Sequence, residues 1–211
     1  MSKRIAGLFI LAGLLLPVAA RADTAAWGFT SGTGVSSTTN YTLGIVFTAN
    51  QNILVDALGY YDPDHVALNG SHDIALFNLT TGGAAVATAT VSSSSTNYYD
   101  NFLYAALGSS SVVLITGDQY VLEAVTGTAG DAYTHNVTGF STNFPITVNG
   151  GNFQSGINLA SGDAATTYTT PSAELFAADF GGSPVPEPSS LLLLGTGLAG
   201  LAGMLKRKLM A

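Results

Sequence analysis

The chain has 211 residues, of which 47% are hydrophobic and 9% are charged, and it contains no cysteine. The lack of cysteine excludes thiol catalysis, iron–sulfur clusters and cysteine-based zinc sites. All thirteen acidic side chains lie within residues 23–187 and all six basic ones lie outside, so this region has a formal charge of −13, against −7 for the whole chain. Because it offers no cation to neutralise phosphates, we predict that nucleic acid is not a partner.

The first residues have the pattern of a secretory signal peptide. A basic pair precedes an apolar stretch over 5–18, and Ala20 and Ala22 form an A-x-A cleavage site. We therefore predict a signal helix within a signal peptide over 1–22. Its partners would be the Sec machinery and a signal peptidase that cuts after Ala22.

Residues 23–181 have the composition of an all-β domain. Short stretches rich in Val, Ile, Thr, Tyr and Phe are separated by clusters of Gly, Asn, Asp and Ser, and apolar and polar residues alternate over 41–48. No helical periodicity precedes residue 189. We predict two antiparallel sheets packed as a jelly-roll-like β-sandwich. The candidate strands are 41–48, 53–60, 73–79, 85–91, 102–107, 111–115, 120–126, 146–148 and 174–180.

The polar residues of this domain form no common hydrolase signature. His65, His72 and His135 belong to no H-E-x-x-H motif, and no serine lies within G-x-S-x-G. We predict no catalytic residue, no metal site and no cofactor, and hence no enzyme.

The densest polar cluster is Asp62-Pro63-Asp64-His65. Two carboxylates two residues apart can share a calcium ion, but the later ligands of an EF-hand are missing. The alternative is a solvated turn in which the aspartates cap the backbone. His72, which precedes Asp73, is predicted to form structural hydrogen bonds.

Sugar binding on stacked aromatic rings is an alternative function for this domain. Neighbouring residues of a strand point to opposite faces, so one ring of each Tyr-Tyr pair can face outward. The same rings can equally be ordinary core and strand-end residues. The aromatic side chains concerned are Trp27, Tyr60, Tyr61, Tyr98 and Tyr99.

The C-terminal residues combine a proline-rich, an apolar and a basic segment. Prolines fix φ and lack an amide proton, so 182–188 is predicted to be an extended linker that cannot enter the interior of a sheet or helix. Residues 189–205 carry no charge and, as a helix rising ~1.5 Å per residue, are just long enough to span a membrane. A buried core helix is the alternative. Because flanking basic residues stay on the cytoplasmic side, 206–211 is predicted to be a cytoplasmic tail, with a basic anchor of Lys206, Arg207 and Lys208.

The apolar segment contains G-x-G-x-x-G over 195–200. A dinucleotide-binding turn would need a preceding strand and an acidic residue about twenty residues later, and both are missing. Gly195, Ala199 and Gly203 are instead spaced by four. This spacing predicts either a small-residue face that packs against another membrane helix, or a small-residue helix with no partner.

Val185-Pro186-Glu187-Pro188, the apolar segment and the basic cluster resemble, in this order, the PEP-CTERM sorting signal of Gram-negative bacteria. The resemblance implies that an exosortase-type membrane protease recognises the tail, and that an inner-membrane-tethered precursor then reaches the cell surface or the medium. Residues 47–122 also resemble β-sandwich cargo domains found ahead of this tail.

The function expected from this resemblance is that of a structural or interaction protein on the cell surface or in the extracellular matrix of a biofilm. Exopolysaccharide is the partner that such a location suggests. The alternative is a carbohydrate-binding β-sandwich delivered by the same route.

Overall fold

The computed structural model describes residues 24–82, 85–157, 159, 166–168, 177–185 and 188–209. The predicted signal peptide, with Ala20 and Ala22, lies outside the described residues. The described strands are β1 (Thr24–Ala25), β2 (Trp27–Gly28), β3 (Ser31–Ser36), β4 (Tyr41–Ala49), β5 (Ile53–Tyr61), β6 (His72–Asn78), β7 (Ala85–Val91), β8 (Asn97–Tyr99), β9 (Phe102–Ala106), β10 (Val112–Leu114), β11 (Gln119–Val125), β12 (Ala132–Thr138), β13 (Ser141–Thr142), β14 (Ile146–Ser155), β15 (Thr166–Tyr168) and β16 (Ala178–Pro184).

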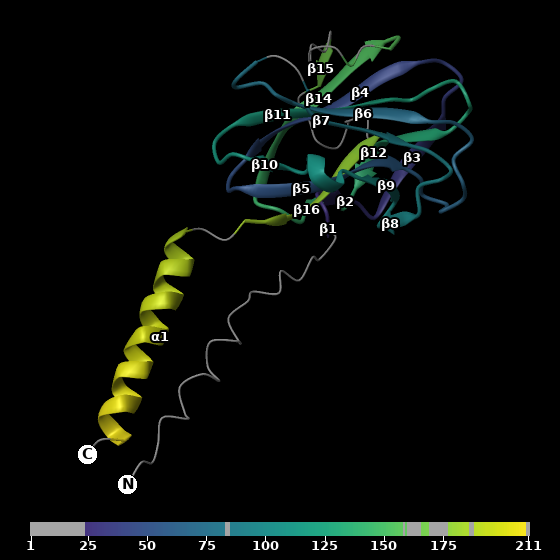
Figure 1. Cartoon of the computed structure of the whole chain (residues 1–211). Coiled ribbons are helices and arrows are strands. Elements are labelled where there is room, and N and C mark those ends of the chain that lie inside the picture. The colour runs from purple at the N-terminus through teal and green to yellow at the C-terminus, as the bar shows by residue number, and fades with distance from the viewer. Residues whose placement is uncertain are drawn as a thin grey trace.

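Two six-stranded antiparallel sheets form the body of the molecule (Figure 1). The first has the order β1-β16-β5-β9-β8 with β10 also beside β5, and the second has the order β15-β14-β4-β11-β6-β7. The chain crosses between the sheets from β4 to β5, from β5 to β6 and again from β7 to β8, as strands do in a jelly roll. β3 and β12 form a separate two-stranded sheet, and so do β2 and β13. The all-β, antiparallel prediction is confirmed.

The core lies between the two sheets and contains aromatic rings from both. Phe47 of β4 stacks on Phe180 of β16 with 5.4 Å between ring centroids, and Trp27 meets both rings edge-on at 6.0 and 5.7 Å. Leu43 and Ile45 point into the same core and are buried. The alternating apolar residues of β4 therefore lie on one face of the strand and pack into the core between the sheets.

The opposite face of the second sheet is covered as well. Ala75, Phe77 and Val121 form a second buried cluster, against which Leu159 packs. Residues on both faces of this sheet are thus buried, which a strict alternation of apolar and polar residues does not predict.

Strand β16 continues three residues into the segment predicted to be a linker. Gly182, Ser183 and Pro184 pair with β5, and the amide of Val185 donates to the carbonyl of Asn52 at 2.9 Å. Pro184 is the last residue of the strand, where a missing amide proton interrupts little of the ladder. The predicted linker boundary at residue 182 therefore differs from the structure, in which residues 182–184 still belong to β16.

The C-terminal helix α1 covers Pro188–Leu209 and projects away from the sandwich (Figure 1). It is longer than the predicted 189–205, because proline fits the first position of a helix and the basic residues continue the last turns. Among the described residues, no helix combines the length and the apolar character needed to cross a membrane. The spanning role of α1 stays a prediction.

A buried carboxyl group joins the first and last strands of the domain. Oδ1 of Asp179 accepts hydrogen bonds from the amides of Ala26 and Phe180 at 3.1 and 2.7 Å, and Oδ2 accepts one from the Tyr104 hydroxyl at 2.7 Å. Burial raises the pKa of Asp179 well above its usual range, and these hydrogen bonds oppose the rise. Tyr104 reaches Asp179 across Gly59 of β5, where an added Cβ would lie 2.5 Å from the tyrosine ring.

We expect Gly59→Ala to lower the free energy of unfolding by about 1–3 kcal/mol, because the new methyl group overpacks a core in which Tyr104 cannot retreat. Gly34→Ala is the matched control, since its Cβ would meet no atom within 4 Å. Urea unfolding of both variants and the parent chain measures the difference. Equal midpoints for the two variants would show that Tyr104 is not held over Gly59.

Candidate functional site: the Asp62 cleft and the C-terminal motif

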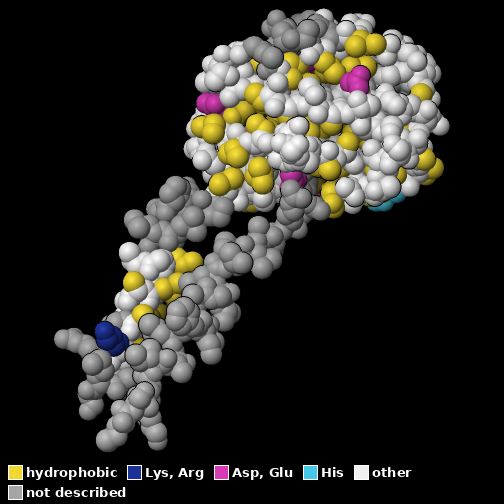
Figure 2. Space-filling model, in the orientation of Figure 1, with side chains coloured by type: hydrophobic (Ala, Val, Ile, Leu, Met, Phe, Trp, Pro, Cys, Tyr) yellow, Lys and Arg dark blue, Asp and Glu magenta, His cyan; other side chains and the backbone are white. Residues whose placement is uncertain are grey.

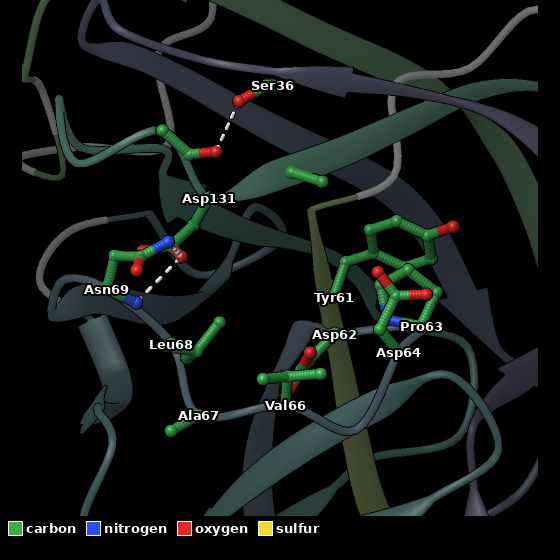
Figure 3. A pocket seen from close by; sticks show the side chains of 12 residues that line it. Ser36, Tyr61, Asp62, Pro63, Asp64, Val66, Ala67, Leu68, Asn69 and Asp131 are labelled. Atoms are coloured by element: carbon green, nitrogen blue, oxygen red, sulfur yellow. Dashed lines mark hydrogen bonds between the residues drawn. The ribbon is translucent and has the colours of Figure 1, made fainter.

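The predicted polar cluster at residues 62–65 lies beside a cleft of about 400 Å³. Its walls come from the loop after β5, the end of β3 and the residues that lead into β12 (Figure 3). The lining residues are Ser36, Tyr61, Asp62, Pro63, Asp64, Val66, Ala67, Leu68, Asn69, Gly130, Asp131 and Ala132.

Asp62 contributes a buried carboxyl group to this cleft. Its side chain accepts hydrogen bonds from the Tyr98 hydroxyl and from the Val66 amide, whereas Oδ2 has no hydrogen-bond partner. Burial raises the pKa of Asp62, and the Tyr98 hydrogen bond, the nearby His65 and the Val66 hydrogen bond counteract the rise. Figure 3 shows a side-chain oxygen of Asp62 turned toward the space between Leu68 and Tyr61.

Asp62 and Asp64 do not act as an equivalent pair. Asp62 is 6% exposed, whereas Asp64 lies at the exposed rim of the cleft. Within the described residues, no three His, Asp or Glu side chains come together as a group able to hold a metal ion. Among the described residues, no third carboxylate or imidazole therefore joins Asp62 and Asp64 as a calcium ligand.

His65 fixes the loop that holds Asp62 and Tyr98 together. Its backbone has a positive φ of 51°, and so does that of Asp100, at 49°. A ring nitrogen of His65 bonds to the carbonyl oxygen of Asp100 at 2.7 Å, and the ring lies 4.8 Å from that of Tyr98. Non-glycine residues seldom adopt this backbone conformation, so these contacts stabilise an otherwise unfavourable loop.

Asp131, which lines the cleft, forms a buried pair with His72. The Nε2 atom of His72 lies 3.0 Å from Oδ2 of Asp131, and Nδ1 lies 3.1 Å from the carbonyl oxygen of Val125. The imidazole can donate to both acceptors only when both ring nitrogens carry protons. The Tyr60 ring stacks on the imidazole at 3.6 Å. His72 is therefore a structural hydrogen-bonding residue, as predicted.

Both carboxylate oxygens of Asp131 are occupied. Oδ1 accepts hydrogen bonds from the amide and side-chain nitrogens of Asn69, and Oδ2 accepts from the amide of Gly70 as well as from His72. Burial alone would raise the pKa of Asp131, but these hydrogen bonds outweigh it and lower the pKa. Sequence reasoning missed Asp131, because 59 residues separate it from His72 and no motif links the two.

The aromatic rings considered for sugar stacking are mostly buried. Trp27 and Tyr60 have no exposed surface and Tyr61 is 5% exposed, so the expectation of an outward ring is wrong for this pair. Both faces of β5 are covered there, because Tyr61 packs against Phe29 and Phe102.

The second tyrosine pair offers no free platform either. The ring of Tyr98 contacts His65, and the ring of Tyr99 lies 5.1 Å from that of Tyr104. Both are half-buried. No row of outward rings therefore forms from the five aromatic residues that the sequence offered.

The C-terminal motif begins where the sandwich ends. The Val185 amide bonds to the domain, Pro186 and Glu187 lie outside the described residues, and Pro188 begins α1. On the helix, Gly195, Ala199 and Lys206 are exposed. Gly203, Arg207 and Lys208 also lie within α1.

Comparison with protein families matches residues 184–208 to the PEP-CTERM protein-sorting motif. The chain carries a PEP-CTERM motif. This motif covers the proline segment, the three small residues and the basic cluster singled out in the sequence, and it directs an exported protein to an exosortase. Comparison with curated proteins finds no significant match to the chain.

We expect Asp131→Asn to lower the free energy of unfolding by about 2–4 kcal/mol at neutral pH, because the amide cannot accept all the hydrogen bonds that converge on the carboxylate. The pKa of Asp131 is lowered by folding, so its contribution is complete above the unfolded value of ~3.9 and is lost as the pH falls through the folded pKa. The difference between variant and parent should therefore shrink below about pH 4.

Chemical unfolding between pH 2 and 8 measures this difference, and the other buried carboxyl groups cancel because both proteins contain them. Asp64→Asn, which removes an exposed carboxylate from the same cleft, should change stability by less than about 0.5 kcal/mol at every pH. A loss in Asp131→Asn that is constant down to pH 2 would contradict the role given to the carboxylate.

Proposed function

We propose that this protein is a surface or extracellular-matrix protein of a Gram-negative bacterium, processed by an exosortase, whose β-sandwich has a structural or interaction role. The observation that carries the proposal is the PEP-CTERM motif at 184–208. In this proposal the signal peptide over 1–22 starts export, and α1 tethers the precursor to the inner membrane until the tail is removed. The domain itself has no catalytic role.

The junction between domain and tail supports this order of events. Strand β16 pairs with β5 up to Pro184, and the Val185 amide bonds to Asn52. Every described strand therefore precedes the proline motif. Cleavage at or after this motif would remove α1 and the basic cluster without removing a strand, so the released sandwich would keep its core.

The surface of the sandwich suits an extracellular location. In Figure 2, Lys and Arg side chains are visible only on the helix, while the visible face of the sandwich carries few acidic side chains among many uncharged ones. Because no Lys or Arg occurs between residues 23 and 187, the Asp and Glu side chains of the domain face no basic side chain of opposite charge. Net charge far from zero favours solubility and opposes self-association.

Sugar recognition is the second candidate function, and one specific observation favours it. The cleft beside Asp62 has a volume of about 400 Å³, which lies in the range of small-molecule sites. The candidate sugar site is therefore this cleft, and not a surface formed by aromatic rings. Exopolysaccharide remains the partner we propose for a matrix protein of this kind.

We expect the protein recovered from the surface or medium of its host to lack residues 1–22 and the residues after the Pro186–Pro188 region. Intact mass spectrometry measures this directly. A mature protein that retains Lys206 to Lys208 would mean that the tail is a permanent anchor.

The variant Glu187→Gln tests whether the protease recognises the negative charge of the motif. If the protease recognises the Glu187 carboxylate, this variant should accumulate as an uncut precursor, whereas Glu174→Gln should be processed as the parent chain is. Normal processing of both variants would show that the protease does not recognise the charge.

A further inference from the structure

Very little chain separates the folded sandwich from the C-terminal helix. The amide of Val185 donates to the carbonyl oxygen of Asn52 at 2.9 Å, and α1 begins at Pro188. Consecutive Cα atoms are ~3.8 Å apart, so the chain from Val185 to Pro188 spans at most about 11 Å. In the proposed precursor, with α1 in the membrane, the end of β16 therefore lies close to the membrane surface.

A protease needs more extended chain than this junction offers. A peptide bound as an added strand is extended and contacts its partner through successive main-chain groups and alternate side chains. Between the Val185 hydrogen bond and the start of α1, the sequence has only Pro186 and Glu187. For an exosortase to bind several residues on each side of a cut in the motif, either the end of β16 or the first turn of α1 has to open.

The end of β16 is held by few contacts. Ser183 and Pro184 lie opposite Leu54 and Ile53 of β5. Ser183 and Val185 are half-buried, and Pro184 is exposed and has no amide proton. A terminal segment with little buried surface belongs to the part of a fold that opens at the lowest free energy.

A β-bulge limits how far this strand opens. The register of β16 on β5 shifts between Gly181 and Gly182, and both glycines also pair with β1 on their other side. Phe180, which precedes them, is fully buried in the core. Residues 183–185 can therefore leave β5 while the strand up to Gly182 keeps its place between two neighbours.

Opening the first turn of α1 is the costlier alternative. Backbone groups that lose their intrahelical hydrogen bonds at a membrane find little water to replace them, and Pro188 suits the first position of the helix as it stands. The end of β16 is on the aqueous side, where water replaces the hydrogen bonds to β5.

We propose that the exosortase binds residues 183–185 together with the motif, so that these residues leave β5 before the tail is cut. Their strand conformation is already extended, so only the contacts with β5 and Asn52 are lost. Detachment precedes any covalent step, and the residues that stay on the sandwich after the cut can pair with β5 again. This inference rests on the processing proposed above and adds that the folded sandwich itself limits its rate.

A disulfide across the ends of the two strands tests this proposal. Ser183 and Leu54 are directly opposite, and opposite residues of antiparallel strands have Cα atoms ~4.5–5.5 Å apart, which a disulfide can bridge. The chain has no cysteine of its own, and exported proteins can form disulfides. Leu54→Cys with Ser183→Cys therefore crosslinks β16 to β5. Asp73→Cys with Thr90→Cys crosslinks β6 to β7 in the other sheet and is the matched control.

Pulse labelling of the full chain in its host follows the conversion of precursor to product, and intact mass identifies both. We expect the 54–183 crosslink to slow conversion by about tenfold or more, because cleavage of an opened segment follows the population of the open form. The 73–90 crosslink should leave the rate of the parent chain unchanged. Equal rates for the two crosslinked chains would overturn this inference alone, whereas a parent chain that is never processed would overturn the proposed function as well.

An insertion shows whether the crosslink acts through the length of available chain. Gly-Ser-Gly-Ser placed between Pro184 and Val185 adds extended chain and leaves Val185 to Pro188 intact. In the 54–183 crosslinked chain, this insertion should restore the rate of the parent chain. A crosslinked chain that stays slow with the insertion would contradict the proposal.

Discussion

The domain has to hold its buried carboxyl groups without any Lys or Arg. No basic side chain occurs between residues 23 and 187, so each buried aspartate depends on hydrogen bonds from backbone amides, hydroxyl groups or a histidine. Asp179 uses two amides and the Tyr104 hydroxyl, and Asp131 uses two amides, the Asn69 side chain and His72. These donors belong to segments far apart in the sequence, so satisfying one carboxylate fixes several strands and loops at once.

Asp62 differs from these two residues. Its carboxyl group is almost as buried and accepts hydrogen bonds from Tyr98 and the Val66 amide, yet Oδ2 has no hydrogen-bond partner. The complete set of donors around Asp131 is the reason that we assign the His72–Asp131 pair to stability.

Local pattern was sufficient to predict the β class and the tail. The alternation in β4 and the ordered sequence of proline, apolar and basic segments are contiguous signals, and each corresponds to one element of the structure. The end of the last strand was not predicted, because Pro184 suggested a linker although a terminal strand position accepts proline. The extension of β14 beyond Val148 was missed because the Asn-Gly-Gly-Asn that follows has turn composition, whereas Asn152 in fact bonds across the sheet to Glu123.

The candidate site was only partly predictable for a related reason. The sequence located the Asp62 cluster, since its polar residues are consecutive, but it could not show that Asp62 is buried and Asp64 exposed. The partnership of His72 and Asp131, and the burial of both Tyr60 and Tyr61, arise from contacts between segments that are far apart in the sequence. Alternation predicts to which face of the sheet each side chain of a strand points, but it does not predict which residues cover that face.

The place of β16 in its sheet also sets when the domain can fold. β16 lies between β1 and β5, and among the described strands β1 pairs with β16 alone, so the first described strand has its partner near the other end of the domain. Such long-range pairing makes closure of the first sheet late, because the intervening chain must be ordered first. A polypeptide threaded through a secretion channel from its N-terminus would stay incompletely folded, and so able to pass, until its final strand had emerged. Completion of the sandwich would then coincide with arrival of the sorting motif at the membrane.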